Sequence, residues 1–129
     1  MKKLFILCMA MIAVCGIAMA KKTANGTSAI KFTEQVWDFG TIRQDKPATH
    51  DFEFINDGDG NLVIVDATAE CGCTKPEFSD KPIAPGKKSK VKVTYNPMGR
   101  PGSFEKTVTV RTNGTPKKVR LKIRGTVKP

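Results

Sequence analysis

Apolar and polar residues alternate with a period of two through most of the chain after residue 28, in short runs. In the run Lys90–Tyr95, valine or tyrosine occupies every second position, and lysine or threonine stands between. Such alternation predicts half-buried antiparallel strands, and no window has apolar residues at helical spacing. The predicted strands are Ala29–Thr33, Val36–Ile42, Thr49–Asn56, Leu62–Ala69, Lys90–Tyr95, Phe104–Thr112 and Lys118–Val127.

The segments between these runs are rich in Gly, Pro, Asn and Asp. Residues 56–61 and Asn113-Gly114 carry turn signals, and the proline-containing segments 82–86 and 96–99 read as loops. Residues 57–61 also match the start of a calcium loop, but Leu62 and Thr68 stand where an EF-hand needs Gly and Glu, so we predict a hairpin turn. About seven short strands at this spacing predict an all-β, immunoglobulin-like antiparallel sandwich.

The first twenty residues have a different pattern. A Lys pair at the start, an apolar run from Leu4 to Val14 and the Ala-Met-Ala of residues 18–20 predict a signal peptide, residues 1–20. Residues 12–15 offer a lesser alternative, a lipoprotein box with Cys15 as the anchor, although Val14 replaces the usual small residue. We therefore expect export to the periplasm or the extracellular space.

The polar residues 21–29 are predicted to be a flexible leader, and residues 30–129 a single domain with no membrane span. Removal of the signal peptide lowers the formal charge from +10 to +8, because it carries Lys2 and Lys3 and no acid. The remaining chain can bury enough surface for a core without disulfides.

Two cysteines follow the predicted signal peptide, Cys71 and Cys73, separated by Gly72. Residues i and i+2 of an extended chain share a face, and the glycine allows a bend, but a bridge at this spacing is expected to be strained and easily reduced. Three interpretations stay open: an inert oxidised pair, a redox pair with Lys75 lowering a thiol pKa, or a site for a soft ion such as Cu(I). Zinc needs four ligands, and His50 is the only further candidate.

Signals for catalysis are weak. His50 lies in a predicted strand beside Asp51 and is interpreted as a packed or half-exposed histidine. The acidic residues are scattered, and neither a nucleophile elbow nor a phosphate loop is present in the sequence. We predict that the protein is not an enzyme, assign no residue to a metal and expect no cofactor.

Basic residues recur at every second position of two predicted strands. The favoured interpretation is a solvated or edge-protecting face, and the functional one is attraction to an anionic partner such as an acidic glycan, lipid headgroups or an acidic protein. Nucleic acid is not expected, because no aromatic residues interleave with the cations. The candidate anion-binding residues are Lys90, Lys92, Lys118, Arg120, Lys122 and Arg124.

The motifs together resemble those of the bacterial domain of unknown function 1573 family, from about Ile30 to Val127. The resemblance implies an exported immunoglobulin-like domain related to the major sperm protein and pilus-chaperone sandwiches, and it implies little about function. Members often carry His before the Asp-Phe-Gly, where this chain has Trp37, which weakens a metal interpretation. The motifs are Asp38-Phe39-Gly40-Thr41-Ile42, Phe52-x-Phe54-x-Asn56-x-Gly58, Cys71-Gly72-Cys73-Thr74-x-Pro76, Pro82-x-x-Pro85-Gly86, Val91-x-Val93-x-Tyr95-Asn96, Gly99-Arg100-x-Gly102-x-Phe104-x-Lys106 and Leu121-x-Ile123-x-Gly125.

The leading functional hypothesis is a non-catalytic binding or structural module of the cell envelope, with a protein or acidic glycan as partner. The alternative is a thiol redox or copper-handling protein that acts through Cys71 and Cys73. The sequence predicts no oligomeric state.

Overall fold

The computed structural model describes residues 26–129. The predicted signal peptide, the possible anchor Cys15 and residues 21–25 of the predicted leader lie outside the described residues.

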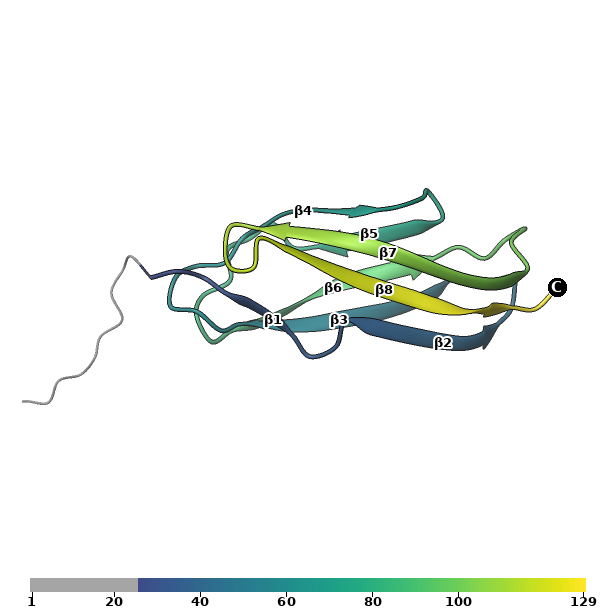
Figure 1. Ribbon diagram of the computed structural model, residues 1–129, viewed down its shortest axis with the longest axis horizontal. Helices are drawn as coiled ribbons and strands as arrows, with labels where there is room; N and C mark the ends of the chain where they lie inside the picture. Colours follow the sequence, from purple (N-terminus) through teal and green to yellow (C-terminus); the bar gives the residue numbers. More distant parts are fainter. Residues whose placement is uncertain (1–25) are drawn as a thin grey trace, which may run out of the picture.

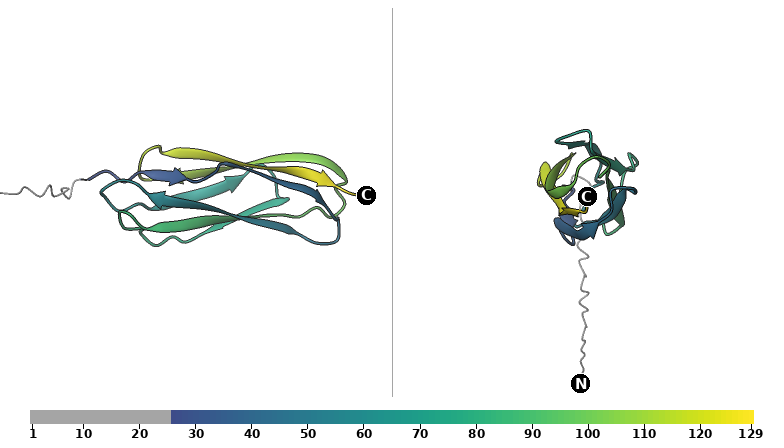
Figure 2. Two further views of the ribbon diagram at one scale, coloured as in Figure 1. Left: turned by 90° about the horizontal axis from the view of Figure 1, so that it is seen from below. Right: turned by 90° about the vertical axis from the view of Figure 1, so that its right-hand side faces the viewer.

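The domain is an elongated sandwich of two four-stranded sheets, with strands running along its long axis (Figures 1 and 2). One sheet has the order β1-β3-β6-β5 and the other β2-β8-β7-β4. The strands are β1 (Ile30–Phe32), β2 (Val36–Ile42), β3 (Ala48–Asn56), β4 (Ile64–Ala69), β5 (Thr74–Phe78), β6 (Lys88–Tyr95), β7 (Gly102–Thr112) and β8 (Lys118–Val127).

The predicted all-β sandwich is confirmed, with three differences in detail. The sequence pattern missed β5, because Pro76 interrupts it; β5 is an edge strand that pairs only with β6, where a proline is tolerated. One pair is parallel, that of β2 with β8, so the sheets are not purely antiparallel. Residues 57–61 join β3 of one sheet to β4 of the other, so the hairpin turn predicted there was wrong.

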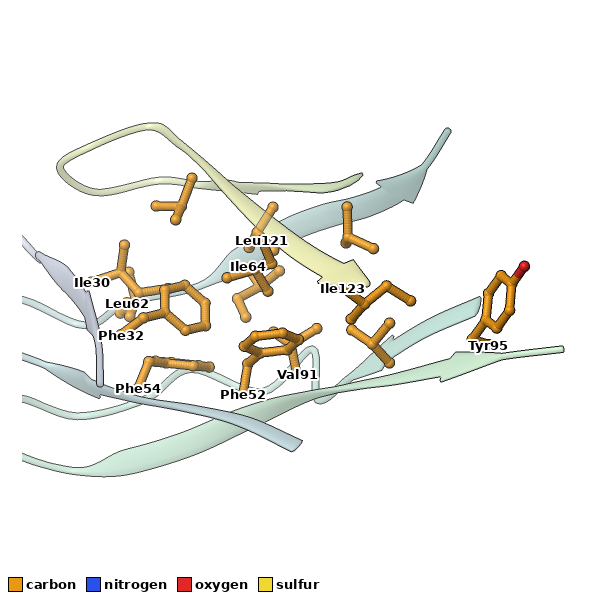
Figure 3. Packing of buried hydrophobic residues seen from close by; sticks show 14 of the residues in the cluster. Ile30, Phe32, Phe52, Phe54, Leu62, Ile64, Val91, Tyr95, Leu121 and Ile123 are labelled. Atoms are coloured by element: carbon orange, nitrogen blue, oxygen red, sulfur yellow. The ribbon is translucent and has the colours of Figure 1, made fainter. Parts of the chain in front are cut away.

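The alternating pattern places one face of each strand in the core, as predicted. Val91, Val93 and Tyr95 of β6 are at most 1% exposed, while Lys90 and Lys92 point to solvent. Figure 3 shows the apolar side chains of both sheets meeting between the layers. The core consists of Ile30, Phe32, Phe52, Phe54, Leu62, Ile64, Cys73, Ile83, Val91, Val93, Tyr95, Val108, Val110, Val119, Leu121, Ile123 and Val127.

The last part of the predicted flexible leader is packed against the sandwich, which corrects that prediction for residues 26–29. Ser28 is buried, and its carbonyl accepts a hydrogen bond of 3.0 Å from the amide of Thr115. Gly58 and Gly114 lie against Thr27 and Ser28 so closely that neither position has room for a Cβ atom. These glycines, read from sequence as turn signals, are therefore required for the approach of the N-terminal segment.

The buried side chain of Asn56 stabilises the same region through hydrogen bonds. Its buried side-chain amide donates to the carbonyls of Gly60 and Ile83, both at 2.8 Å. Its oxygen accepts from the amides of Gly58 at 3.0 Å and Ala29 at 3.3 Å. One side chain thus ties β3 to two loops and to the segment before β1, at the end of the sandwich opposite the C-terminus (Figure 1).

The other end, here called the C-terminal end, carries the connections 43–47, 70–73 and 96–101 together with residues 128–129 (Figure 1). Tyr95 closes the core there (Figure 3). Its ring stacks on that of Phe104, with 3.9 Å between the centroids. Phe104 lies directly opposite Gly125 in the β7–β8 ladder, where a Cβ atom would meet its ring at 3.0 Å. The glycine therefore makes room for the aromatic pair.

Candidate functional site

The four basic residues of β8 lie along the outer face of the sheet β2-β8-β7-β4. Lys118, Arg120 and Arg124 are exposed and Lys122 is partly exposed, while the alternate residues of β8 point into the core. Residues two apart on a strand are separated by about 6.6 Å, so the side chains form a line rather than a cluster. The predicted common face of these residues is confirmed.

Only half of this line is compensated by acids. Lys122 Nζ lies 3.5 Å from Glu105, and Arg124 Nε lies 3.5 Å from Asp38. Within residues 26–129, no carboxylate lies within ion-pair distance of Lys118 or Arg120.

The cross-strand neighbours of the uncompensated half add to its positive character. Arg120 faces Thr109, and Lys118 faces another cation, Arg111. Like charges directly opposite each other on a sheet are destabilising. Arg111 is partly compensated by Asp66, at 3.7 Å. This part of the face therefore keeps an excess of positive charge.

Lys90 and Lys92 belong to a different surface, the outer face of the other sheet. Their neighbours in the ladders are acidic: Glu53 faces Lys90, and both Asp51 and Glu77 face Lys92. Lys90 Nζ also lies 3.4 Å from Asp51. The six candidate anion-binding residues are thus divided between two opposite faces, and among these six only Lys118 and Arg120 have neither an ion pair nor an acidic neighbour in a ladder.

Cys71 and Cys73 are joined in a disulfide at the C-terminal end, in the turn that carries the chain from β4 to β5 and so from one sheet to the other. The turn brings the Cα atoms to 5.3 Å, inside the range of ordinary disulfides, so the expected bend at Gly72 is confirmed. Cys73 is buried and Cys71 is partly exposed. Donors approach both sulfurs: the amide of Cys73 lies 3.2 Å from Cys71 Sγ, and Thr74 Oγ1 lies 3.5 Å from Cys73 Sγ.

His50 is held by packing, in agreement with its interpretation from the sequence. Its ring stacks on Trp37 with 4.0 Å between centroids and meets Phe52 edge-on at 4.8 Å. Its Nε2 lies 2.6 Å from Glu34 Oε1. In the part of the chain that the structure describes, no three His, Cys, Asp or Glu side chains come together in a group that could hold a metal ion.

Sequence reasoning missed a groove at the C-terminal end, beside the disulfide. It has a volume of about 370 Å³, and its walls include Pro47, Cys73 and Met98. Met98 is 66% exposed, more than the other large hydrophobic side chains among residues 26–129 that reach the surface. The available signal in the sequence was Met98, a large apolar residue in the predicted loop between Pro97 and Gly99.

Comparison with known proteins identifies a family and a fold. The model of the family "Protein of unknown function (DUF1573)" matches residues 30–127, and no curated protein matches the chain. A protein of unknown function from Porphyromonas gingivalis W83 is similar in structure, with a TM-score of 0.70 and 17% identity over 81% of this chain. The match covers 49% of that protein, so the chain spans about half its length.

Two further structures share the fold at low identity. The PapD-like domain 7 of human CEP192 has a TM-score of 0.61 and 12% identity, covering 92% of this chain and 97% of that one. The secreted serine protease VesC from Vibrio cholerae has a TM-score of 0.58 and 15% identity, covering 77% of this chain and 23% of the protease. The likenesses confirm the predicted immunoglobulin-like class of sandwich. Among residues 26–129 there is no helix that could cross a membrane.

Proposed function

The chain belongs to the DUF1573 family, and on that premise we propose that it is an exported, non-catalytic binding module of the cell envelope that holds an anionic partner on the outer face of β8. The observation that carries this proposal is the uncompensated charge of Lys118 and Arg120. The strand fixes the backbone positions of these cations, so an anion that binds them orders their side chains but not the backbone. Edge protection is the competing explanation, because β2 pairs with β8 only from Lys122 onward and leaves Lys118 and Arg120 without a β2 neighbour; it predicts no preference of the polymers for these two residues.

The chemistry of this face favours an acidic glycan over an acidic protein. Thr68 and Thr109 are neighbours in the β4–β7 ladder, and Thr109 faces Arg120, so hydroxyl groups lie beside the cations. Hydroxyl groups and cations suit sugar hydroxyls and carboxylates. Protein interfaces are instead built around large aromatic or aliphatic anchors, and the strands that flank this face expose only Val36 and Val65 of the large hydrophobic residues.

The experiment compares two variants that lose the same charge from opposite faces. Lys118→Gln with Arg120→Gln removes the uncompensated cations, and Lys90→Gln with Lys92→Gln removes two cations that have acidic neighbours. Binding to polygalacturonate, dextran sulfate and poly-glutamate is measured by titration calorimetry at several salt concentrations. The first variant is expected to weaken binding to polygalacturonate by about tenfold or more, and the control by less than about threefold.

Equal weakening by the two variants would mean that net charge, not the β8 face, attracts the polymer, and the proposal would be wrong. Tighter binding of poly-glutamate than of either polysaccharide would move the partner to an acidic protein.

A second candidate function is thiol–disulfide exchange or copper handling by the cysteine pair. It is favoured by the hydrogen-bond donors next to both sulfurs, Thr74 and the amide of Cys73, which would stabilise thiolates after reduction. Two thiolates are sufficient for Cu(I). Changing both cysteines to Ser separates this candidate from a structural disulfide, because only this candidate predicts loss of Cu(I) uptake or thiol exchange at unchanged stability.

A further inference from the structure

The groove at the C-terminal end is built from three connections that are distant in the sequence and from the adjoining ends of β5 and β6. Lys46 and Pro47 come from the β2–β3 loop, Gly72 and Cys73 from the disulfide turn, and Met98 from the β6–β7 loop. Its volume of about 370 Å³ lies within the range of sites that bind small ligands and single side chains. The walls are mostly apolar, and the Met98 side chain stands exposed beside them.

Hydrogen bonds hold the three connections in place. The amide of Asn96 donates to the carbonyl of Cys73 at 2.8 Å, and the amide of Gly99 donates to the side chain of Gln44 at 3.2 Å. Gln44 in turn donates to the carbonyl of Lys128 at 3.2 Å. Loops fixed in this way lose little conformational entropy when a ligand arrives, which favours binding.

The rim of the groove is positively charged. Lys46 and Lys75 line it, and within residues 26–129 neither has a carboxylate at ion-pair distance. Asp45 also lines the groove, but both of its oxygens are bound by Arg43, at 3.0 and 2.7 Å, and this pairing lowers the pKa of the Asp45 carboxyl. Its negative charge is therefore already matched.

From this combination we propose that the groove binds a linear, acidic protein segment, which inserts one long apolar side chain beside Met98 and places carboxylates near Lys46 and Lys75. The apolar walls provide the anchor and the cations select acidic flanks. This site is separate from the proposed anion-binding part of β8, because β8 begins at the end of the sandwich opposite the C-terminus (Figure 1), and Lys118 is its first residue.

Binding is tested with two acetylated pentapeptides, Asp-Glu-Leu-Asp-Glu and Asp-Glu-Ser-Asp-Glu, added to the protein labelled with ¹³C at methionine methyl groups. Met98 is the only methionine after residue 19, so its signal is assigned from the variant Met98→Leu. The Leu peptide should shift the Met98 signal and bind about tenfold or more tightly than the Ser peptide, as burial of a leucine side chain implies.

Three variants separate the groove from other surfaces, with binding measured by fluorescence anisotropy. Met98→Glu should lower the affinity for the Leu peptide about tenfold or more, whereas the affinity of Met98→Leu should stay within about threefold of that of the unaltered protein. Lys46→Gln with Lys75→Gln should weaken the binding of the Leu peptide and make that binding less dependent on salt concentration. Amide spectra of each variant establish that the fold is retained.

Three results would overturn the proposal. The first two are equal affinity for the two peptides and no binding of either at about 1 mM. The third is a loss of affinity for the Leu peptide in Lys118→Gln with Arg120→Gln that is as large as the loss in Lys46→Gln with Lys75→Gln. The last would place the peptide on β8. None of these results changes the polysaccharide titration, so failure of the groove is distinguishable from failure of the proposed function.

Discussion

The side chain of Asn56 offers the sharpest test of what stabilises this sandwich. It uses all four hydrogen-bonding positions of its amide and is fully buried. Asn56→Ala removes the four bonds together. The carbonyl of Ile83 keeps the amide of Leu62 at 2.9 Å, but the amide of Ala29 loses its Asn56 acceptor.

The expected cost follows from the number of bonds. A typical hydrogen bond contributes a net 0.5 to 1.5 kcal/mol, and a buried group left without a partner costs about 1 to 3 kcal/mol. With one of the four groups still paired, we expect Asn56→Ala to lower the free energy of unfolding by about 4 kcal/mol. For a domain of this size that corresponds to a fall in melting temperature of roughly 15 °C.

Asn113→Ala is the matched control, because the same amide makes three bonds at an exposed position. Its oxygen accepts from Val63 at 2.8 Å and from Ser28 at 3.2 Å, and its nitrogen donates to Asn61 at 3.3 Å. Water can replace most of these partners, so the expected cost is about 1 kcal/mol or less.

Urea unfolding followed by the fluorescence of the single tryptophan measures both variants. Equal costs for Asn56→Ala and Asn113→Ala would refute the reasoning, since burial would then not decide the value of these bonds. A cost below about 1 kcal/mol for Asn56→Ala would refute it as well.

Two further predictions concern the C-terminal end. Changing both Cys71 and Cys73 to Ser should lower the free energy of unfolding by about 1 to 2 kcal/mol, the loop-closure value for so short a loop, in urea unfolding experiments. An unchanged stability together with loss of Cu(I) uptake or thiol exchange would instead support the second candidate function. Burial raises the pKa of Tyr95, partly offset by Arg100, so this contribution to stability is complete below the unfolded-state pKa of about 10 and is lost as the pH rises through the folded-state value. Because Tyr95 is the only tyrosine, its absorbance titration in folded and urea-unfolded protein tests this directly, and identical midpoints would contradict it.

The period-two pattern was sufficient for most of the fold. Residues on one face of β6 and β8 are buried and those on the other are exposed, because each strand of a two-layer sandwich has one side facing the other sheet and one side facing solvent. The pattern could not reveal β5, where Pro76 and two short polar runs conceal an edge strand. Nor could it reveal the pairing of β2, because parallel and antiparallel neighbours bury the same alternate residues.

The motif Phe52-x-Phe54-x-Asn56-x-Gly58 shows what a sequence motif conceals. Its phenylalanines stand two apart in the predicted strand Thr49–Asn56, and both lie in the core. Asn56 and Gly58 were interpreted as turn residues, whereas they receive the segment of residues 27–29, more than 25 positions earlier. Contacts of this kind depend on tertiary packing and leave no local signal.

For the candidate surfaces, sequence established which basic residues share a strand but not which of them are compensated. The acids that neutralise Lys122, Arg124 and Lys90 come from other strands, namely Glu105, Asp38 and Asp51. The groove could not be predicted from the sequence, because its walls come from segments that are distant along the chain.

The parallel pairing of β2 with β8 also governs when the protein can become folded. Val36 pairs with Lys122, 86 positions later in the chain. At 5 to 20 residues per second, a ribosome needs roughly 4 to 17 s to synthesise that interval, and during this time the partner of β2 does not yet exist. Pairings so distant in sequence form slowly even after synthesis ends. The sheet β2-β8-β7-β4 therefore cannot be completed until the last strand has been made. A chain that is still incompletely folded is what a protein-conducting channel accepts, which suits the proposed export.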